Sequence, residues 1–335
     1  MKKGKEKVFK QRCRLFFMAD KINDLIFKEL IRSGYSLQGH TRIWNIANSK
    51  LWYLTPKQAQ AYLDLEESKD YGKRIFMKEI KMLKKFMPEI AEQILHGSAL
   101  NLIDIGCGDG KKAITPIQIL SSKTKVRYCP IDISSFMVSK AIKEISKRKL
   151  SNGGIVNFRW NISDFDNLEN VASLLRDAEY RQNLFLFLGD TLSNFEAHEV
   201  LYELVEAMDE GEDYLLIGVT LNSVNPNELV KPYKAKMVDD FLSLILTQIG
   251  FNRDELEFDV RFANSRVEIF YTLKNSKALD LSGKKIYFDK GDQILVGISY
   301  RYTAEQLEEF MKIYFNNFKF YFNEDKTRTL ILCEK

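Results

Sequence analysis

NLIDIGCGDGKK, residues 101–112, joins a short apolar run to a turn that contains three glycines. An apolar run that stops at a glycine-rich turn is typical of a buried strand entering a tight loop. Because Gly106, Gly108 and Gly110 carry no β-carbon, a ligand can approach the backbone of this loop closely. Asp104 falls at the carboxyl end of the strand, which is the edge where open α/β sheets bind ligands. The glycines alone fit an ordinary strand-to-helix turn about equally well, so the interpretation depends on the strands after the loop.

Two further strands that end near acidic residues favour a ligand site. The run 126–131 (VRYCPI) ends in Asp132 about 20 residues after the loop, where a carboxylate can accept both hydroxyls of a ribose. The run 155–160 is followed by Asp164 and Phe165, which suit an adenine amine and the face of its ring. Together these residues resemble the S-adenosylmethionine site of a Rossmann-like methyltransferase. An NAD site fits less well, because GxGxG replaces the GxGxxG spacing that brings a pyrophosphate to the helix.

The composition is that of an ordinary globular chain. Its 335 residues can bury a large core in one or two joined domains, and 45% hydrophobic and 29% charged residues are typical of soluble proteins. The net charge of +4 is too small to indicate a nucleic-acid binder. The amino-terminal segment is more basic, with Lys2, Lys3, Lys5, Lys7, Lys10, Arg12 and Arg14 against Glu6. A solvated helix start or frayed tail is the ordinary explanation of this cluster, and an RNA-contacting arm is the alternative.

Cysteine and histidine residues are scattered. The four cysteines form no CxxC pair, which argues against a zinc ribbon or a disulfide framework and suits a reducing compartment. The three histidines are equally dispersed, so no metal site is expected. No apolar run reaches membrane-spanning length, and the amino terminus lacks a signal-peptide core. We therefore expect a cytoplasmic protein without a metal or a membrane contact.

Strand and helix patterns alternate from residue 100 onward. The predicted strands are 100–105, 126–131, 155–160, 184–188 and 213–219, with helices at 111–121, 134–149, 167–178 and 196–208. This alternation predicts a mostly parallel sheet with helices on both faces. After Thr220 the pattern changes to a helix at 238–249 and alternating segments at 256–273 and 284–300, which are typical of antiparallel strands. A helix from Thr303 and two strands within 318–333 complete the chain.

The part before residue 100 is predicted to be helical around an irregular aromatic segment. Helices are expected over 5–33 and from Thr55-Pro56 to Leu95, with an interruption near Met87-Pro88. Residues 35–55 contain Trp44, Trp52 and Tyr53, whose rings either plug a core or form the wall of a pocket.

A second constellation, GDTLSNF at 189–195, follows the strand LFLFL. It is expected at the same sheet edge as Asp104 and Asp132. It lacks the Asp/Asn-Pro-Pro-aromatic turn that is common in amino methyltransferases acting on nucleic-acid bases. Asn194 can donate and accept hydrogen bonds without charge, which suits the ammonium or carboxylate of an amino acid. An asparagine in a turn more commonly shapes the backbone, so the residue alone is weak support.

The chain resembles the histidine-specific N-α-methyltransferase family of ergothioneine biosynthesis, which also includes a fungal dimethylallyltryptophan N-methyltransferase. The resemblance begins near Trp52 and is carried by WYLTPKQA, DIGCGDGKK, YCPIDIS, SDF, FLGDTLSNF, RVEIF and GDQILVGISYRYT, which are specific in their order and spacing. It implies an α/β fold: a Rossmann-like class I methyltransferase sheet with a second, smaller α+β substrate-binding domain. The first domain would comprise residues 57–221 and 300–335, and the second 1–56 and 222–299.

The resemblance also implies site residues. The donor S-adenosylmethionine would be bound by Asp104, Gly106, Gly108, Gly110, Lys112, Asp132, Asp164, Phe165 and Gly189. The backbone of an amino-acid acceptor would meet Tyr53, Gly189, Asn194 and Tyr233, with Tyr53 and Asn194 as the catalytic pair. The acceptor side chain would meet Ile269, Gly297 and Ser299.

One position departs from the family pattern. Where the histidine enzymes place a glutamate against the imidazole, this chain has Gly297, while Ser299 is retained. Losing a carboxylate that hydrogen-bonds a polar side chain removes strong discrimination. Gly297 is also expected to open space, so histidine is doubtful and a larger or less basic amino acid or amine is at least as good a candidate. A bulge at Gly297, or a register shifted by one residue, is the alternative explanation.

The sequence therefore predicts an S-adenosylmethionine-dependent N-methyltransferase that acts on the α-amine of an amino acid or a related small amine. The protein would chiefly position the partners for in-line attack, and burial would lower the pKa of the amine, so no general base is named. An RNA or protein methyltransferase is one alternative, and a regulatory protein that binds the donor without turnover is another. A monomer is expected, and nucleic acid is not expected as a partner.

Overall fold

The computed structural model describes residues 23–68, 72–148, 154–157, 161–162, 167–222, 225–281 and 284–335. The basic amino-terminal cluster and the predicted donor contacts Asp164 and Phe165 lie outside the described residues. No described helix combines the length and the apolar character that crossing a membrane requires.

The larger sheet has six strands in the order β12-β13-β6-β5-β3-β4. Their bounds are β3 Leu100–Ile105, β4 Val126–Ile131, β5 Gln182–Phe187, β6 Tyr214–Thr220, β12 Asn317–Phe322 and β13 Arg328–Glu334. Strands β4, β3, β5 and β6 run parallel, and β13 lies antiparallel between β6 and β12. Single bridges from Tyr128 to Ile155 and from Asp132 to Ile162 continue the sheet beyond β4, along part of the strand predicted at 155–160.

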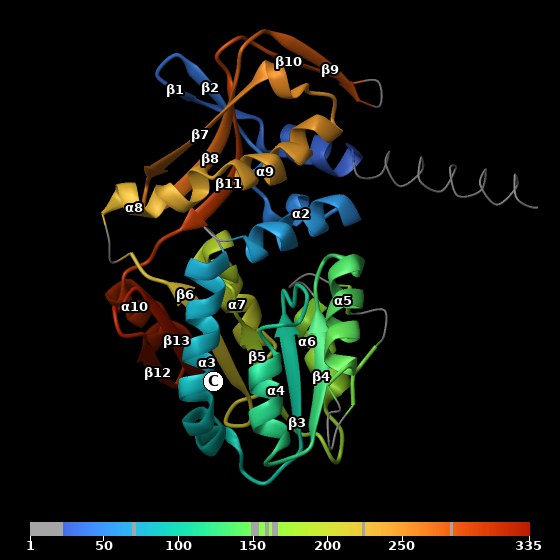
Figure 1. Ribbon diagram of the computed structural model, residues 1–335, viewed down its shortest axis with the longest axis vertical. Helices are drawn as coiled ribbons and strands as arrows, with labels where there is room; N and C mark the ends of the chain where they lie inside the picture. The colour runs from blue at the N-terminus through green and yellow to red at the C-terminus, as the bar shows by residue number, and fades with distance from the viewer. Residues whose placement is uncertain are drawn as a thin grey trace, which may run out of the picture.

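Helices cover both faces of this sheet (Figure 1). One face packs against α3 (Gly72–Ile94), α4 (Ile114–Ser121) and α5 (Ser135–Ser146), and the other against α6 (Leu168–Leu175), α7 (Ala197–Glu206) and α10 (Ala304–Tyr314). All residues of β3 and β5 are buried, because helices cover both sides of these strands. This is why their sequences are nearly continuous apolar runs instead of alternating ones. The predicted Rossmann-like α/β fold is confirmed.

A second, five-stranded sheet has the order β1-β2-β11-β8-β7. Its strands are β1 Tyr35–Gln38, β2 Thr41–Asn45, β7 Leu256–Ala263, β8 Arg266–Leu273 and β11 Gln293–Tyr300, and β9 (Lys277–Leu281) and β10 (Lys284–Phe288) form a separate hairpin. Helix α9 (Lys236–Gln248), which comes after α8 (Pro226–Val230) and η5 (Lys231–Lys234), shares a buried apolar core with β8 and β11. Residues 23–33 form a helix that packs into the same core.

Helix α2 (Pro56–Glu67) lies between the two sheets in Figure 1. Thr55 caps it in a reciprocal capping box with Gln58, and Gln58 Nε2 also donates to the Leu51 carbonyl at 3.0 Å. This bond fixes the preceding short helix η1 (Ser49–Trp52) to α2. Leu63 of α2 packs with Met137 of α5, whereas Leu65 joins the core of the smaller sheet. Helix α2 therefore contacts both layered units, and the predicted division at residue 57 stays a prediction.

Two expectations for the regular elements are wrong, and one strand was not expected. Residues 35–55 are not irregular but form β1, β2 and η1, because β2 finds a parallel partner in β11, far away in the chain. Helix α3 is not interrupted near Pro88. The neighbours Met87, Ile90 and Ala91 are fully buried, and this packing outweighs the hydrogen bond that proline cannot make. Strand β9 was not predicted at all.

Candidate functional site

The glycine loop wraps the carboxyl end of β4. Gly106 N and Cys107 N both donate to the Ile131 carbonyl, at 2.9 and 3.0 Å. The three loop glycines have φ values of 67°, 54° and 78°, a region that residues with a β-carbon seldom adopt. At Gly110 a β-carbon would also lie 3.0 Å from Ala141 Cα of α5, whereas nothing lies within 4 Å of its place at Gly108. The loop is thus packed tightly on one side and open on the other.

Asp132 stands at the open side of the loop. Its carboxylate accepts hydrogen bonds from Gly108 N at 3.2 Å and Ser134 N at 2.9 Å. Burial raises the pKa of Asp132 to about 6, although these backbone bonds act in the opposite direction. The carboxylate therefore has acceptor capacity left, in an environment that favours a hydrogen-bonding ligand.

Two other predicted donor residues lie behind the loop and do not line the pocket. Asp104 accepts a hydrogen bond from the Tyr128 hydroxyl at 2.7 Å, and burial raises its pKa to about 6. Lys112 forms an ion pair with Glu66 of α2, and its Nζ would lie 2.9 Å from a β-carbon at position 189. Both side chains support the backbone of the site.

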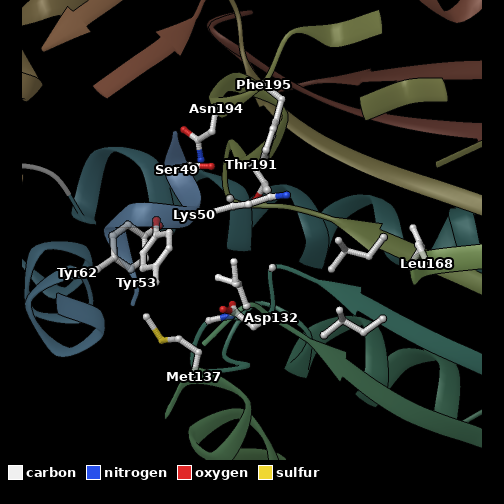
Figure 2. A pocket seen from close by; sticks show the side chains of 16 residues that line it. Ser49, Lys50, Tyr53, Tyr62, Asp132, Met137, Leu168, Thr191, Asn194 and Phe195 are labelled. Atoms are coloured by element: carbon white, nitrogen blue, oxygen red, sulfur yellow. The ribbon is translucent and has the colours of Figure 1, made fainter. Parts of the chain in front are cut away.

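A pocket of about 800 Å³, counting the solvent-filled space at its mouth, opens in front of this loop. Its lining includes Ser49, Lys50, Tyr53, Tyr62, Gly106, Gly108, Asp132, Met137, Leu168, Gly189, Thr191, Asn194 and Phe195. In Figure 2, Tyr53 and Tyr62 form one side of this pocket, Asp132 and Met137 lie below, and Asn194 and Phe195 lie above. The sequence did not point to Lys50, Tyr62 or Met137, which carry no motif of their own, and Thr191 was not singled out although it lies within GDTLSNF.

A second, smaller pocket of about 530 Å³ adjoins the first on the side of α9. Its lining combines apolar side chains with polar ones: Trp52, Tyr53, Tyr62, Leu65, Gly189, Asp190, Asn194, Tyr233, Val238, Phe241, Leu242, Ile269, Ile298 and Ser299. Tyr53, Tyr62, Gly189 and Asn194 line both pockets. The predicted acceptor residues are thereby brought together, with the exception of Gly297.

The expected open space at Gly297 is absent. A β-carbon there would lie 3.2 Å from Ile269 Cδ1 and 3.5 Å from Leu242 Cδ1, so these two side chains occupy the space. The pairing of β11 with β8 shifts register between Leu295 and Gly297, which is a β-bulge. The expectation of added space is therefore wrong, and the alternative of a bulge is confirmed. Ile269 and Ser299 line the pocket directly.

Tyr53 remains a neutral phenol in this environment. Burial, followed by the charges of Asp132 and Glu66, raises its pKa well above the ordinary value of 10.0. Its ring meets that of Tyr62 edge to face, with 5.1 Å between the centroids. Tyr53 can therefore orient a ligand by hydrogen bonding, but it is a poor base at neutral pH.

A buried ion network holds the turn that contains Gly189. Gly189 N donates to both carboxylate oxygens of Glu79, each at 3.0 Å, and Glu79 pairs with Arg328 at 3.0 Å. Arg328 also pairs with Asp190 at 3.1 Å, and Asp190 accepts from Thr220 N at 2.6 Å. The carboxylate of Glu79 fits only because position 218 is glycine, where a β-carbon would lie 2.1 Å from Glu79 Oε1. The sequence signal for Glu79 was a charged residue on the apolar face of α3, three and four positions before Met82 and Leu83.

The lining of the larger pocket fits S-adenosylmethionine. The open space at Gly108 permits close approach to the backbone, and Asp132 offers a partly buried acceptor for hydroxyl groups. Ile131, Ile133 and Leu168 supply apolar surface for a flat ring. This combination of a glycine cradle, an acceptor and apolar walls suits a nucleoside-bearing ligand.

Comparison with known proteins identifies the family. The model of a family described as histidine-specific, S-adenosylmethionine-dependent methyltransferases matches residues 62–335. No curated protein sequence gives a match.

Similar solved structures are distant. DesVI of Streptomyces venezuelae is 10% identical over 76% of this chain and 92% of its own, with a TM-score of 0.33. The DszA carbon methyltransferase is 11% identical over 87% of this chain and 60% of its own, with a TM-score of 0.43. DhpI in complex with SAH is 10% identical over 78% of this chain and 96% of its own, with a TM-score of 0.32.

The family match extends from α2 to the carboxyl terminus, so it includes the glycine loop, Asp132, the Gly189 turn and β11. Because it covers most of the chain and agrees with the fold and the donor pocket, this protein belongs to the histidine-specific, S-adenosylmethionine-dependent methyltransferase family.

Proposed function

We propose that this enzyme methylates the α-amine of an amino acid, or of a closely related small amine, whose side chain is apolar or aromatic. The observation that carries the proposal is the pair of adjoining pockets, which share Tyr53, Tyr62, Gly189 and Asn194. A group held in the smaller pocket would meet a donor held in the larger one across these shared residues. The smaller pocket combines apolar side chains with Asn194, Tyr233 and Ser299, as suits an apolar side chain joined to a polar backbone.

Residues of the larger pocket would bind the methyl donor, and residues of the smaller pocket would orient the acceptor. Bound S-adenosylmethionine supplies an activated methyl group on a sulfonium sulfur. Asp132 would hold donor hydroxyl groups, while Asn194 and Tyr233 would orient the acceptor backbone. Tyr53 would hydrogen-bond the amine without taking its proton, because its own pKa is far above neutrality. Burial lowers the pKa of an amine, so the apolar surroundings favour the unprotonated form that reacts.

Histidine is not the expected acceptor. The smaller pocket presents Val238, Phe241, Leu242 and Ile269 to a side chain, and Gly297 does not line it. The carboxylate that does line this pocket, Asp190, is already bonded to Arg328 and Thr220. An imidazole would find apolar walls where it needs a charged acceptor, whereas an apolar or aromatic side chain would find matching surface.

Labelled S-adenosylmethionine and a panel of amino acids and amines, followed by mass spectrometry, test the proposal. We expect mass gains on the α-amine of apolar or aromatic amino acids and a lower kcat/KM for histidine. Asn194→Ala should lower kcat/KM for every active acceptor, because the backbone anchor is common to all of them. Asn227→Ala, the same change at an exposed position of α8, is the control and should leave turnover unchanged.

Three other outcomes would contradict the proposal in whole or in part. Label only on RNA or protein would indicate a macromolecular acceptor, and donor binding without turnover on any acceptor would indicate a regulatory protein. Histidine methylated far faster than all other amino acids would overturn the specificity claim alone.

A further inference from the structure

Arg301 is a buried cation directly behind the smaller pocket. It comes directly after β11 and is only 3% exposed. Its guanidinium donates to the Tyr300 carbonyl at 2.9 Å and to the Tyr233 hydroxyl. The Tyr233 hydroxyl in turn donates to Ser299 Oγ at 3.1 Å, and Tyr233 and Ser299 both line the pocket. Arg301 therefore touches the pocket wall from behind, through Tyr233.

The charge of Arg301 is balanced differently from that of most other arginines. Among the residues that the structure describes, Arg301 forms no ion pair with a carboxylate, although nine other arginines do. The nearby acid is Asp190, which already pairs with Arg328 at 3.1 Å and bonds Thr220. The charge of Arg301 helps to lower the pKa of Asp190, but that carboxylate is shared with Arg328, and the hydrogen-bond partners of Arg301 are neutral. A buried charge in this position carries a desolvation cost that an added anion would offset. The pocket in front of Tyr233 is where such an anion can enter.

We propose that Arg301 makes the acceptor pocket selective for amines that also carry a carboxylate, by acting through the Tyr233 hydroxyl. The inference rests on the proposed function and assigns the recognition of one acceptor group to a residue outside both pocket linings. A guanidinium that donates to a phenol oxygen polarises the O–H bond and makes the hydroxyl a stronger donor. The acceptor carboxylate receives this hydrogen bond in place of Ser299 Oγ and adds a negative charge near Arg301. An amine without a carboxylate leaves Arg301 with Asp190, which it shares with Arg328, as the nearby negative charge.

Matched ligand pairs test this inference. L-Phenylalanine and phenethylamine share a side chain and an amine but differ in the carboxylate, as do L-tryptophan and tryptamine. Their dissociation constants are measured by calorimetry on the full chain, saturated with S-adenosylhomocysteine so that no turnover occurs. In the unchanged protein the amino acid should bind at least about tenfold more tightly than the matching amine, the range expected for a hydrogen bond to a charged group.

Four variants isolate the role of Arg301. Arg301→Met should remove most of the tenfold preference by weakening amino-acid binding, with amine binding little changed, and Arg301→Lys should restore part of it. Tyr233→Phe should cause the same selective loss, and the double variant should be no worse than either single one, because the two residues act as one unit. Arg261→Met is the control: Arg261 pairs with Glu268 at 2.7 Å in the same sheet and lines neither pocket.

Each contrary result has its own meaning. Arg301→Met would not discriminate between the ligands if it weakened the binding of the amino acid and of the amine by the same factor, and Arg301 would then only stabilise the pocket wall. The inference would then fail, while the proposed function would stand. Should Arg301→Met not fold, as melting curves would reveal, an unchanged preference in Tyr233→Phe would overturn the inference. If the unchanged protein bound amine and amino acid equally, carboxylate selectivity itself would be absent. If it bound neither, the proposed function would fail, and the inference with it.

Discussion

Asp132 is the residue on which donor binding is expected to depend most. It has acceptor capacity beyond its bonds to Gly108 and Ser134, and it lines the larger pocket. Asp132→Ala should weaken the binding of S-adenosylhomocysteine by about 1.5–3 kcal/mol, the cost of losing hydrogen bonds to a charged group. Calorimetry measures this change, with Asp254→Ala on the exposed segment η6 (Arg253–Glu255) as the control. Unchanged affinity in Asp132→Ala would refute the assignment of this residue.

The raised pKa of Asp132 predicts that donor affinity depends on pH. The pKa in the folded protein is about 6, because burial disfavours the charged form. A ligand hydroxyl donates best to the ionised carboxylate, so donor affinity should be constant above this value and decrease as the pH falls through about 6. In Asp132→Ala this decrease should disappear, since no carboxylate is left there to titrate.

A substitution at Gly297 is expected to change which acceptors the enzyme prefers. Gly297→Glu should raise kcat/KM for imidazole-bearing acceptors relative to apolar ones, because it supplies the missing carboxylate. The new side chain must displace Ile269, whose Cδ1 lies 3.2 Å from the place of the β-carbon, and overpacking of this kind costs about 1–3 kcal/mol. Combining Gly297→Glu with Ile269→Ala should recover stability and strengthen the change in ranking. A panel of acceptors assayed on both variants measures it, and an unaltered ranking in the double variant would contradict the prediction.

Helix α3 contributes Glu79, which bonds Gly189 after β5 and Arg328 at the start of β13. Glu79→Gln removes the charge that balances Arg328 and should lower the free energy of unfolding by about 3 kcal/mol, in the range for breaking a buried ion pair. Urea denaturation measures the loss. Glu89→Gln on the same helix is the matched control, because the Glu89 pair with Lys319 is about half exposed and should contribute little. Equal effects from the two variants would show that burial does not distinguish these pairs.

Elements with local signals could be predicted from the sequence, and elements that depend on distant partners could not. Strand β3 and its glycine loop carry a continuous apolar run and a turn within a dozen residues, so both were predicted with the right ends. Strand β2 is stabilised by β11, and nothing in residues 41–45 identifies that partner. Gly297 shows the same limit at the site, since whether a glycine opens space depends on Ile269 of the neighbouring strand.

At the scale of the whole molecule, the two pockets lie where the layered units meet. Tyr53 and Tyr62 come from the region of η1 and α2, while Asp132 comes from the edge of the larger sheet (Figure 2). Gly189 follows β5 in the same sheet. Because Tyr53 and Tyr62 line both pockets, a ligand in one should order the wall of the other.

This shared wall predicts coupled binding. An amino-acid acceptor should bind at least about fivefold more tightly when S-adenosylhomocysteine is present, a coupling of about 1 kcal/mol. Calorimetric titration of the acceptor with and without S-adenosylhomocysteine measures the coupling, and the reverse titration must give the same factor. Independent binding of the two ligands would show that the shared residues are already rigid in the free protein.

Gly218 has a consequence for how this chain can diverge over evolution. Its missing β-carbon leaves the space that the Glu79 carboxylate fills, and Glu79 in turn meets Arg328 of the last strand. A substitution at any one of these three positions alone leaves a clash or an unbalanced charge in the core. Lineages that replace Gly218 should therefore also have lost the acid at position 79 and the arginine at position 328. These three positions, far apart in the sequence, should therefore be substituted together among related proteins.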